Sequence, residues 1–261
     1  MIDLHCHILP YVDDGSTCLE ESLDMAAMAA DTGVTDLVCT PHLDAVDGRV
    51  EALVERMGES YALLSGALRE TGIPLRIHPG AEIFFRPETS SLLRRGLLPT
   101  LAGGRYLLVE FFFDTPAEDI TVMLDAVAAE GCCPLIAHPE RYEAVKRAPE
   151  AAHAWYRKGY LLQLNKGSLL GAFGKTVQKA AIHLLNQQVV HTVASDAHRA
   201  TARTPHMQEL MDFLRRQCSP DYDYVKLLTE DNPRRILRSE AVPPTREILR
   251  PQKREKGKDS R

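Results

Sequence analysis

Side chains that can bind metal ions follow almost every short apolar run of this sequence. Each run has the length of a β-strand, and histidine, aspartate or glutamate lies at or just beyond its end. If the strands form a barrel, their ends share one rim, and residues far apart in the chain meet in one cluster. The pattern therefore predicts a polynuclear metal site and, with it, a hydrolase. The nine candidate metal ligands are His5, His7, Asp14, His42, Glu82, Glu110, His138, Asp196 and His198.

Two ligand pairs near opposite ends of the chain support this interpretation. His5 and His7 are two residues apart at the end of the first apolar run, and Asp196 and His198 repeat the spacing after the last one. Alternate residues of a strand point to the same face, so each pair presents two ligands together. Ionisable groups at the end of a buried strand are costly unless they are paired or bound to a metal. We expect the two pairs to be neighbours in a closed barrel.

Strand and helix patterns alternate along the chain, which predicts an α/β fold. The expected strands are 2–5, 36–40, 75–79, 106–110, 134–137, 160–164 and 189–194. The expected helices are 19–31, 50–71, 117–130, 150–157 and 175–186. The strands are apolar throughout, as expected when both faces of a parallel sheet are buried. A single TIM-like (β/α) barrel of about seven strands is favoured over a doubly wound open sheet, which would spread the strand ends along a line.

Composition excludes several classes of function. The net charge of −5 gives no basic face for a nucleic acid. No apolar run approaches the roughly 20 residues that cross a bilayer. The N-terminus has no secretory pattern, and the six cysteines lack CxxC spacing. We expect a cytoplasmic enzyme that binds no nucleic acid and does not insert into membranes, with one domain over 1–240 and a disordered, charged tail over 241–261.

Several segments resemble one known superfamily. They are 5–10 (His-Cys-His-Ile-Leu-Pro), Asp13-Asp14-Gly15, Thr40-Pro41-His42, Gly80-Ala81-Glu82-Ile83, 106–111, Ala137-His138-Pro139-Glu140-Arg141-Tyr142, Ala194-Ser195-Asp196-Ala197-His198 and 203–207. Together they resemble the PHP (polymerase and histidinol phosphatase) superfamily, and within it the bacterial protein-tyrosine phosphatases of the CpsB/CapC/YwqE type. The resemblance covers about residues 1–240. Departures are Tyr11, Ser16 and the pair Phe112-Phe113, none of them at a ligand position.

The resemblance implies a trinuclear centre on a distorted seven-stranded barrel. The implied groups are His5, His7, Glu82 and Asp196 for one ion, Glu82 as a bridge with Glu110 and His138 for the second, and Asp14, His42 and His198 for the third. Imidazole and carboxylate ligands without a thiolate suit Mn, Zn or Fe, and Mn is favoured in the family. Arg141 and Arg203 match arginines near the family's site, where a guanidinium would bind phosphate oxygens.

The expected chemistry needs no cysteine nucleophile. None of the six cysteines is followed by arginine at the sixth position, so the Cys-x5-Arg loop of thiol-dependent tyrosine phosphatases is absent. A water activated between two metal ions would attack phosphorus instead. The family implies a substrate: the phosphotyrosine tail of a bacterial tyrosine autokinase that controls capsule or exopolysaccharide synthesis. It also implies that the protein could form a homo-oligomer.

Three other interpretations remain open at this point. A histidinol-phosphatase-like phosphoesterase of the same superfamily would use much the same ligands, and a DNA-processing member is disfavoured by the acidic body. A metal-dependent amidohydrolase would bridge its ions with a carbamylated lysine, but only Lys166 follows a strand, the sixth, and Glu82 occupies the bridging role. A non-catalytic regulatory module would not need an intact set of ligands.

Overall fold

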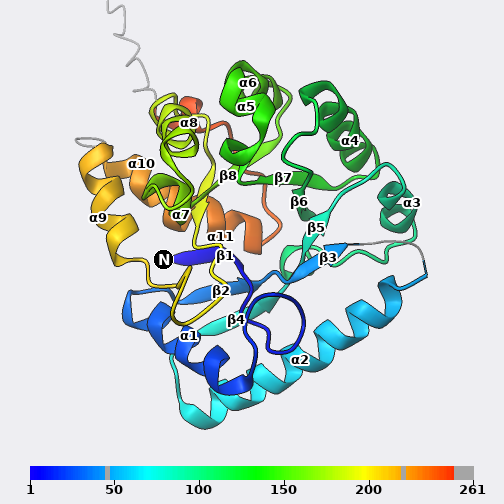
Figure 1. Ribbon diagram of the computed structural model, residues 1–261, viewed down its shortest axis with the longest axis vertical. Helices are drawn as coiled ribbons and strands as arrows, with labels where there is room; N and C mark the ends of the chain where they lie inside the picture. Colours follow the sequence, from blue (N-terminus) through cyan, green and yellow to red (C-terminus); the bar gives the residue numbers. More distant parts are fainter. Residues whose placement is uncertain (45–47, 219–221, 250–261) are drawn as a thin grey trace, which may run out of the picture.

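The computed structural model describes residues 1–44, 48–218 and 222–249, which form an α/β fold with parallel sheets. Helices surround the strands in Figure 1, where β4 lies beside the long helix α2. The strands are β1 (Ile2–Cys6), β2 (Asp36–Cys39), β3 (His42–Asp44), β4 (Arg76–Pro79), β5 (Glu82–Phe84), β6 (Tyr106–Glu110), β7 (Cys133–Ala137), β8 (Leu161–Asn165) and β9 (Thr192–Ala194). One sheet has the order β1-β2-β4, and the other has the order β3-β5-β6-β7-β8-β9.

The helices reproduce the expected pattern and add shorter ones. The α-helices are α1 (Leu19–Asp31), α2 (Val50–Thr71), α3 (Thr89–Arg94), α4 (Ala117–Ala129), α5 (Glu143–Arg147), α6 (Glu150–Arg157), α7 (Lys166–Leu169), α8 (Lys175–Asn186), α9 (Gln208–Gln217), α10 (Tyr222–Lys226), α11 (Asn232–Leu237) and α12 (Thr245–Leu249). The 3-10 helices are η1 (Leu101–Gly103) and η2 (Pro139–Arg141), and η3 (Leu227–Asp231) is a π-helix. The expected helix 50–71 ends where Gly72 adopts φ 70°, a left-handed cap that glycine takes without strain.

The described residues contain nine strands, where the sequence pattern predicted about seven. The difference arises because each of the second and third expected strands, 36–40 and 75–79, is followed after a short break by a further strand. Thr40 and Pro41 separate β2 from β3, and proline has no N–H to donate to a ladder. Gly80 separates β4 from β5, where a Cβ would lie 2.8 Å from Val38 Cγ1. The pieces beyond each break have three residues, too few to recognise from the sequence.

The first and last strands lie next to each other. An isolated parallel bridge joins Cys6 to Ala197, just after β9. The His7 N–H donates to the Ala197 carbonyl (2.8 Å), and the Asp196 N–H donates to the His5 carbonyl (2.9 Å). This contact brings the two ligand pairs of the sequence together, as expected. Cys6 itself is fully buried in the hydrophobic core, on the face of β1 opposite the ligands, as predicted.

The C-terminal segment corrects the expected disorder of 241–261. Residues 245–249 form α12, and Thr245 is buried with its hydroxyl donating to the Val190 carbonyl at 2.9 Å. The expectation is therefore wrong for this helix, whose anchoring is a non-local contact that composition does not reveal. Residues 250–261 lie outside the described residues.

The longest helix of the described residues is α2, which has 22 residues and is amphipathic. It buries residues such as Met57 and Leu64 while leaving most of its length polar and exposed. Within the described parts of the chain, no helix combines the length and the apolar character needed to cross a membrane.

The buried residue His191, just before β9, predicts that the fold is less stable in acid. His191 accepts a hydrogen bond from the Leu162 N–H at Nδ1 (3.1 Å), and burial lowers its pKa from 6.5 to about 3. Below pH 6.5, His191 binds a proton in the unfolded chain but stays neutral in the folded protein. The free energy of unfolding therefore falls as pH drops from about 6.5 towards 3. The slope is up to about 1.4 kcal/mol per pH unit.

The measurement is urea unfolding of metal-free protein at several pH values. His191→Asn, which keeps an acceptor, should flatten the pH dependence between pH 6.5 and 4. His183→Asn, at an exposed histidine of α8, should follow the wild type. Equal slopes for wild type and His191→Asn would contradict the prediction.

Candidate metal centre

The structure brings all nine candidate ligands into one cluster at the carboxyl ends of the strands. His5 lies in β1, His42 in β3, Glu82 in β5 and Glu110 at the end of β6. The other five lie in the segments that follow β1, β7 and β9: His7, Asp14, His138, Asp196 and His198. β8 contributes no candidate ligand. Because the strands are parallel, their ends meet on one rim, which is how residues 5 to 198 become neighbours.

Glu82 lies at the centre of the cluster, fully buried and surrounded by histidines. Its Oε2 is 3.2 Å from His5 Nε2, 3.4 Å from His7 Nε2 and 3.0 Å from His42 Nδ1. Its Oε1 is 2.9 Å from His138 Nε2. Burial opposes ionisation of Glu82, but the charge of His5 and hydrogen bonds from His138, His42 and His5 outweigh it and hold the pKa well below its usual range. This carboxylate can face several cations at once.

Asp196 also faces His5 and His7. Its Oδ1 lies 3.4 Å from both His5 Nε2 and His7 Nε2, and the two imidazole nitrogens are 3.2 Å apart. Ligand atoms about 2.1 Å from one tetrahedral or octahedral ion lie about 3.0–3.5 Å from each other. The separations therefore fit donors arranged around a common ion.

The outer edge of the cluster is more open to solvent. Asp14 Oδ1 lies 3.6 Å from His42 Nε2 and 3.5 Å from His198 Nε2, and the Asp14 side chain is 66% exposed. On the inner side, His42 Nδ1 is also 3.0 Å from Glu110 Oε1. Burial lowers the pKa of His42, but Glu110 and Glu82 outweigh it and raise the value to about 10. A bound cation would take the place of such protons.

Three compact groups of donors fit divalent ions. Their members are His5, His7 and Asp196; His42, Glu82 and Glu110; and His7, Asp14, His42 and His198. Glu82 Oε2 is buried and lies 3.0–3.4 Å from nitrogens of His5, His7 and His42, so it faces members of all three groups. These groups overlap the implied three-ion assignment but share His7 and His42 between sites. The assignment of each ligand to one ion therefore stays a prediction. The donors are imidazoles and carboxylates, a set suited to Mn, Zn or Fe.

Three residues of the site hold a left-handed backbone conformation. His138 has φ 35°, Asp196 has φ 49° and Arg203 has φ 50°. Such a conformation costs of order 1–3 kcal/mol for a residue other than glycine and persists only where the surroundings enforce it. Here it turns the chain sharply at the ends of β7 and β9, so that side chains point into the cluster.

The two predicted arginines lie at the edge of the cluster and converge on one atom. Arg203 Nη2 is 2.5 Å from Asp196 Oδ2, and Arg141 Nη1 is 3.8 Å from the same oxygen. Arg203 Nη1 also lies 3.2 Å from His198 Nε2. Both guanidinium groups thus face the same carboxylate oxygen of the ligand cluster. Their role in binding it stays a prediction.

Comparison with known proteins places this fold and cluster in a family. The family described as "Capsular polysaccharide synthesis, CpsB/CapC" matches residues 1–238. The chain belongs to this CpsB/CapC family. It is 34% identical over 242 residues to the tyrosine-protein phosphatase YwqE of Bacillus subtilis, covering 93% of each chain. It is 32% identical over 247 residues to the tyrosine-protein phosphatase CpsB of Streptococcus pneumoniae, covering 93% of this chain and 100% of the relative. The resemblance seen in the sequence motifs is therefore confirmed.

Solved structures agree with this membership. The chain matches one of the crystal structures of YwqE from Bacillus subtilis and CpsB from Streptococcus pneumoniae, which are described as unique metal-dependent tyrosine phosphatases. The match has a TM-score of 0.83 at 32% identity and covers 93% of this chain and 96% of that one. The phosphotriesterase homology protein of Escherichia coli matches with a TM-score of 0.54 at 12% identity and shows the fold alone. The CpsB/CapC member therefore shares its overall fold with both of these proteins.

Sequence reasoning missed the amides of β8 that support the ligands of this CpsB/CapC protein. Gln163 Oε1 lies 2.8 Å from His5 Nδ1, and the Asn165 amide donates to Asp196 Oδ2. The Gln163 amide also donates to Asn165 Oδ1 at 2.7 Å. Such contacts orient ligands and raise their basicity. Their signal was available, because two polar residues alternate in an otherwise apolar strand, so that both side chains face the cluster.

Asp13 was also missed, although it adjoins a candidate ligand. Its Oδ2 lies 2.7 Å from His7 Nδ1 and accepts from the His42 N–H at 2.8 Å. Burial opposes its ionisation, but the bond to His7 and the backbone donors outweigh it and lower the pKa of Asp13 to about 2. Gly15 allows the tight turn, since a Cβ there would lie 2.2 Å from the His7 carbonyl oxygen. Asp13 therefore orients His7, whereas Asp14 faces His42 and His198.

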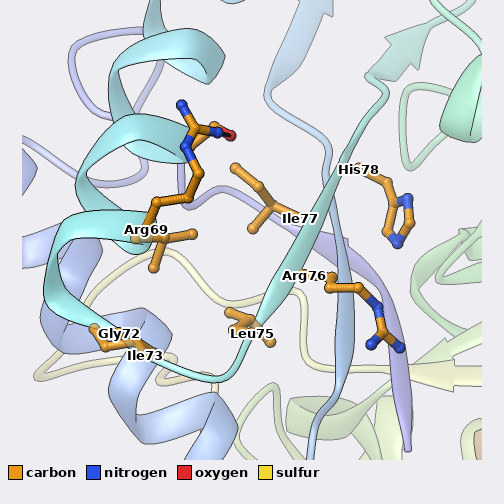
Figure 2. A pocket seen from close by; sticks show the side chains of 9 residues that line it. Arg69, Gly72, Ile73, Leu75, Arg76, Ile77 and His78 are labelled. Atoms are coloured by element: carbon orange, nitrogen blue, oxygen red, sulfur yellow. Dashed lines mark hydrogen bonds between the residues drawn. The ribbon is translucent and has the colours of Figure 1, made fainter.

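Two further features of this CpsB/CapC protein lie apart from the cluster. The Lys166 ammonium donates to the carbonyls of Thr204 and His206, so it is engaged by backbone rather than by a candidate ligand. Figure 2 shows a hollow of about 440 Å³ between α2 and β4, with Ile77 directed towards α2 and both Arg76 and His78 on the opposite side of the strand. Asp36 pairs with Arg76 at 2.7 Å and with His78 at 3.0 Å, so these charges are already compensated.

Proposed function

We propose that this chain is a metal-dependent protein-tyrosine phosphatase that hydrolyses phosphotyrosine in protein substrates. The observation that carries the proposal is the convergence of nine imidazole and carboxylate side chains around Glu82, with two arginines at the edge. Relatives named tyrosine-protein phosphatase, 32–34% identical over nearly the whole chain, support the reaction type. The donors of the cluster would hold the ions, and Arg141 and Arg203 would bind the phosphoryl oxygens.

The chemistry divides between the ions and the protein. When bound, divalent ions supply Lewis acidity and a water of lowered pKa for attack on phosphorus. The protein's own contribution is to orient the ligands through Asp13, Gln163 and Asn165, and to place two guanidinium groups against the phosphate. Positive charge aimed at the equatorial oxygens stabilises the transition state more than the ground state. Cys6, which lies between two candidate ligands in the sequence, is buried in the hydrophobic core and is not placed to act as a nucleophile.

We infer that the finer arrangement is a distorted seven-stranded barrel with three divalent ions, Mn being favoured. If each interrupted strand is counted once, with β2–β3 as one and β4–β5 as another, seven strands result. The contact of Cys6 with Ala197 supports closure between the first and last strands. Three overlapping donor groups support three ions. The barrel would occupy 1–240.

The proposed substrate is the phosphotyrosine tail of a bacterial tyrosine kinase that regulates capsule or exopolysaccharide synthesis, in the cytoplasm. The family's description, capsular polysaccharide synthesis, supports this biological setting. The partly exposed outer edge of the cluster, at Asp14 and His42, suits a phosphorylated side chain that arrives on a flexible segment. We also infer a homo-oligomer, with the exposed face of α2 as the candidate interface.

Removal of metal should abolish activity. Purified protein would be treated with EDTA, with and without restored Mn²⁺, and assayed on a phosphotyrosine peptide and on histidinol phosphate, with metal content measured on each sample. We expect peptide hydrolysis to fall by about 10²-fold or more on chelation and to return with Mn²⁺.

The other outcomes identify the alternatives. Activity confined to histidinol phosphate would replace the proposal with a small-molecule phosphoesterase. Binding of the phosphopeptide without hydrolysis of either substrate at full metal content would indicate a non-catalytic regulatory module.

A further inference from the structure

The guanidinium of Arg141 lies between two aromatic rings. Its Cζ is 4.4 Å from the centre of the Phe113 ring and 4.6 Å from the centre of the Phe173 ring. The Arg203 Cζ is also 5.6 Å from the Phe173 ring centre. Cations within about 6 Å of an aromatic face are attracted to it. Phe173 is thus a ring that both candidate phosphate-binding arginines share.

The Arg203 side chain has few other contacts that would keep it in place. Its backbone has φ 50°, its Nε is buried without a hydrogen-bond partner, and its terminal nitrogens contact Asp196 and His198. Arginine has many rotamers, so a guanidinium fixed at one end is readily misplaced. The Phe173 ring, 5.6 Å from the Arg203 Cζ, limits this freedom.

The short helix α7 contacts both the Phe173 ring and the loop that carries Arg203. At Gly167 in α7, a Cβ would lie 2.8 Å from Phe173 Cε2, so only glycine leaves room for the ring. From the residue before it, the Lys166 ammonium donates to the carbonyls of Thr204 and His206, which follow Arg203 in the chain. α7 therefore fixes Phe173 and the Arg203 loop relative to each other.

We propose that Phe173 is a positioning residue that aligns Arg141 and Arg203 as one unit against the substrate phosphate. This inference rests on the proposed phosphatase function. It adds that the two arginines depend on the same ring, so that loss of the ring weakens both. Of the two arginines, Phe113 contacts Arg141, so its loss would affect that arginine only.

The first test compares Phe173→Leu with Phe173→Tyr in the metal-loaded protein. Leucine keeps apolar bulk without the aromatic face, and tyrosine keeps the face. We expect Phe173→Leu to lower kcat/KM on a phosphotyrosine peptide by about 10-fold or more and to weaken inhibition by inorganic phosphate. Phe173→Tyr should stay within about 3-fold of wild type, and metal content should be unchanged in both.

Gly167→Ala supplies a variant that displaces the ring without altering it. It should reproduce the loss seen in Phe173→Leu. A double-mutant cycle distinguishes this role from a purely structural one. In the Arg203→Ala background, Phe173→Leu should lower kcat/KM clearly less than it does in the wild type, because one of the two arginines that the ring positions is gone.

The outcomes separate the two proposals. A wild-type protein that hydrolyses no phosphotyrosine would overturn the proposed function itself. An active wild type with an unchanged Phe173→Leu variant, or with a loss of the same size in the Arg203→Ala background, would overturn the inference alone. Loss of bound metal in Phe173→Leu and Gly167→Ala would also overturn it, since the ring would then support the ion cluster rather than the arginines.

Discussion

Replacement of Glu82 by glutamine is expected to lower phosphotyrosine hydrolysis by at least about 10³-fold, in line with the several kcal/mol that a bound metal ion contributes to a transition state. Glu82 is fully buried, and its two carboxylate oxygens face four histidines at 2.9–3.4 Å. Glutamine has nearly the same shape but no negative charge, and its NH₂ group is a poor ligand. Two adjacent ion positions should therefore be weakened together.

The measurement combines steady-state kinetics with metal analysis of the purified variant. Glu88→Gln is the matched control, because Glu88 is exposed in the segment after the same strand and has no contact with the cluster among the described interactions. It should retain wild-type rate and metal content. A Glu82→Gln protein with full metal content and full activity would show that Glu82 does not bridge the ions.

Replacement of Arg203 by alanine is expected to lower kcat/KM by about 10²–10³-fold, the usual cost of removing one group that stabilises transition-state charge. The guanidinium contacts Asp196 and His198 through its terminal nitrogens and sits at the edge of the cluster. It is not itself a metal ligand, so bound metal should remain. Arg203→Lys should recover part of the activity, because lysine keeps the charge but not the planar fork.

Arg199→Ala is the matched control on the same loop. Arg199 Nη1 lies 3.3 Å from Glu21 Oε2, so the change removes an arginine that points to α1 instead of the cluster. Its kinetics should match the wild type within a few-fold. Arg203→Ala with unchanged kinetics would exclude Arg203 from phosphate binding, and Arg203→Ala with lost metal would make it a support of the ion cluster.

The position of the cluster was predictable because it depends on local pattern. His5 and Glu110 lie at the ends of β1 and β6, Glu82 lies just beyond the end of β4, and parallel strands place such ends on one rim. The polar residues of β8 carried a weaker signal of the same kind. Gln163 and Asn165 alternate within an apolar strand, but amides are not typical ligands, so their support of His5 and Asp196 was missed.

Sequence alone determined the ligand chemistry, the alternation of strands and helices, and the membership suggested by the motifs, because residue type, hydrophobic pattern and short motifs are local properties. Only the tertiary structure decided where strands break, as at Pro41, and that Thr245 anchors a terminal helix on Val190. It alone showed that the Phe173 ring lies close to both Arg141 and Arg203. These features depend on contacts between segments distant in the chain, whose energies no local pattern encodes.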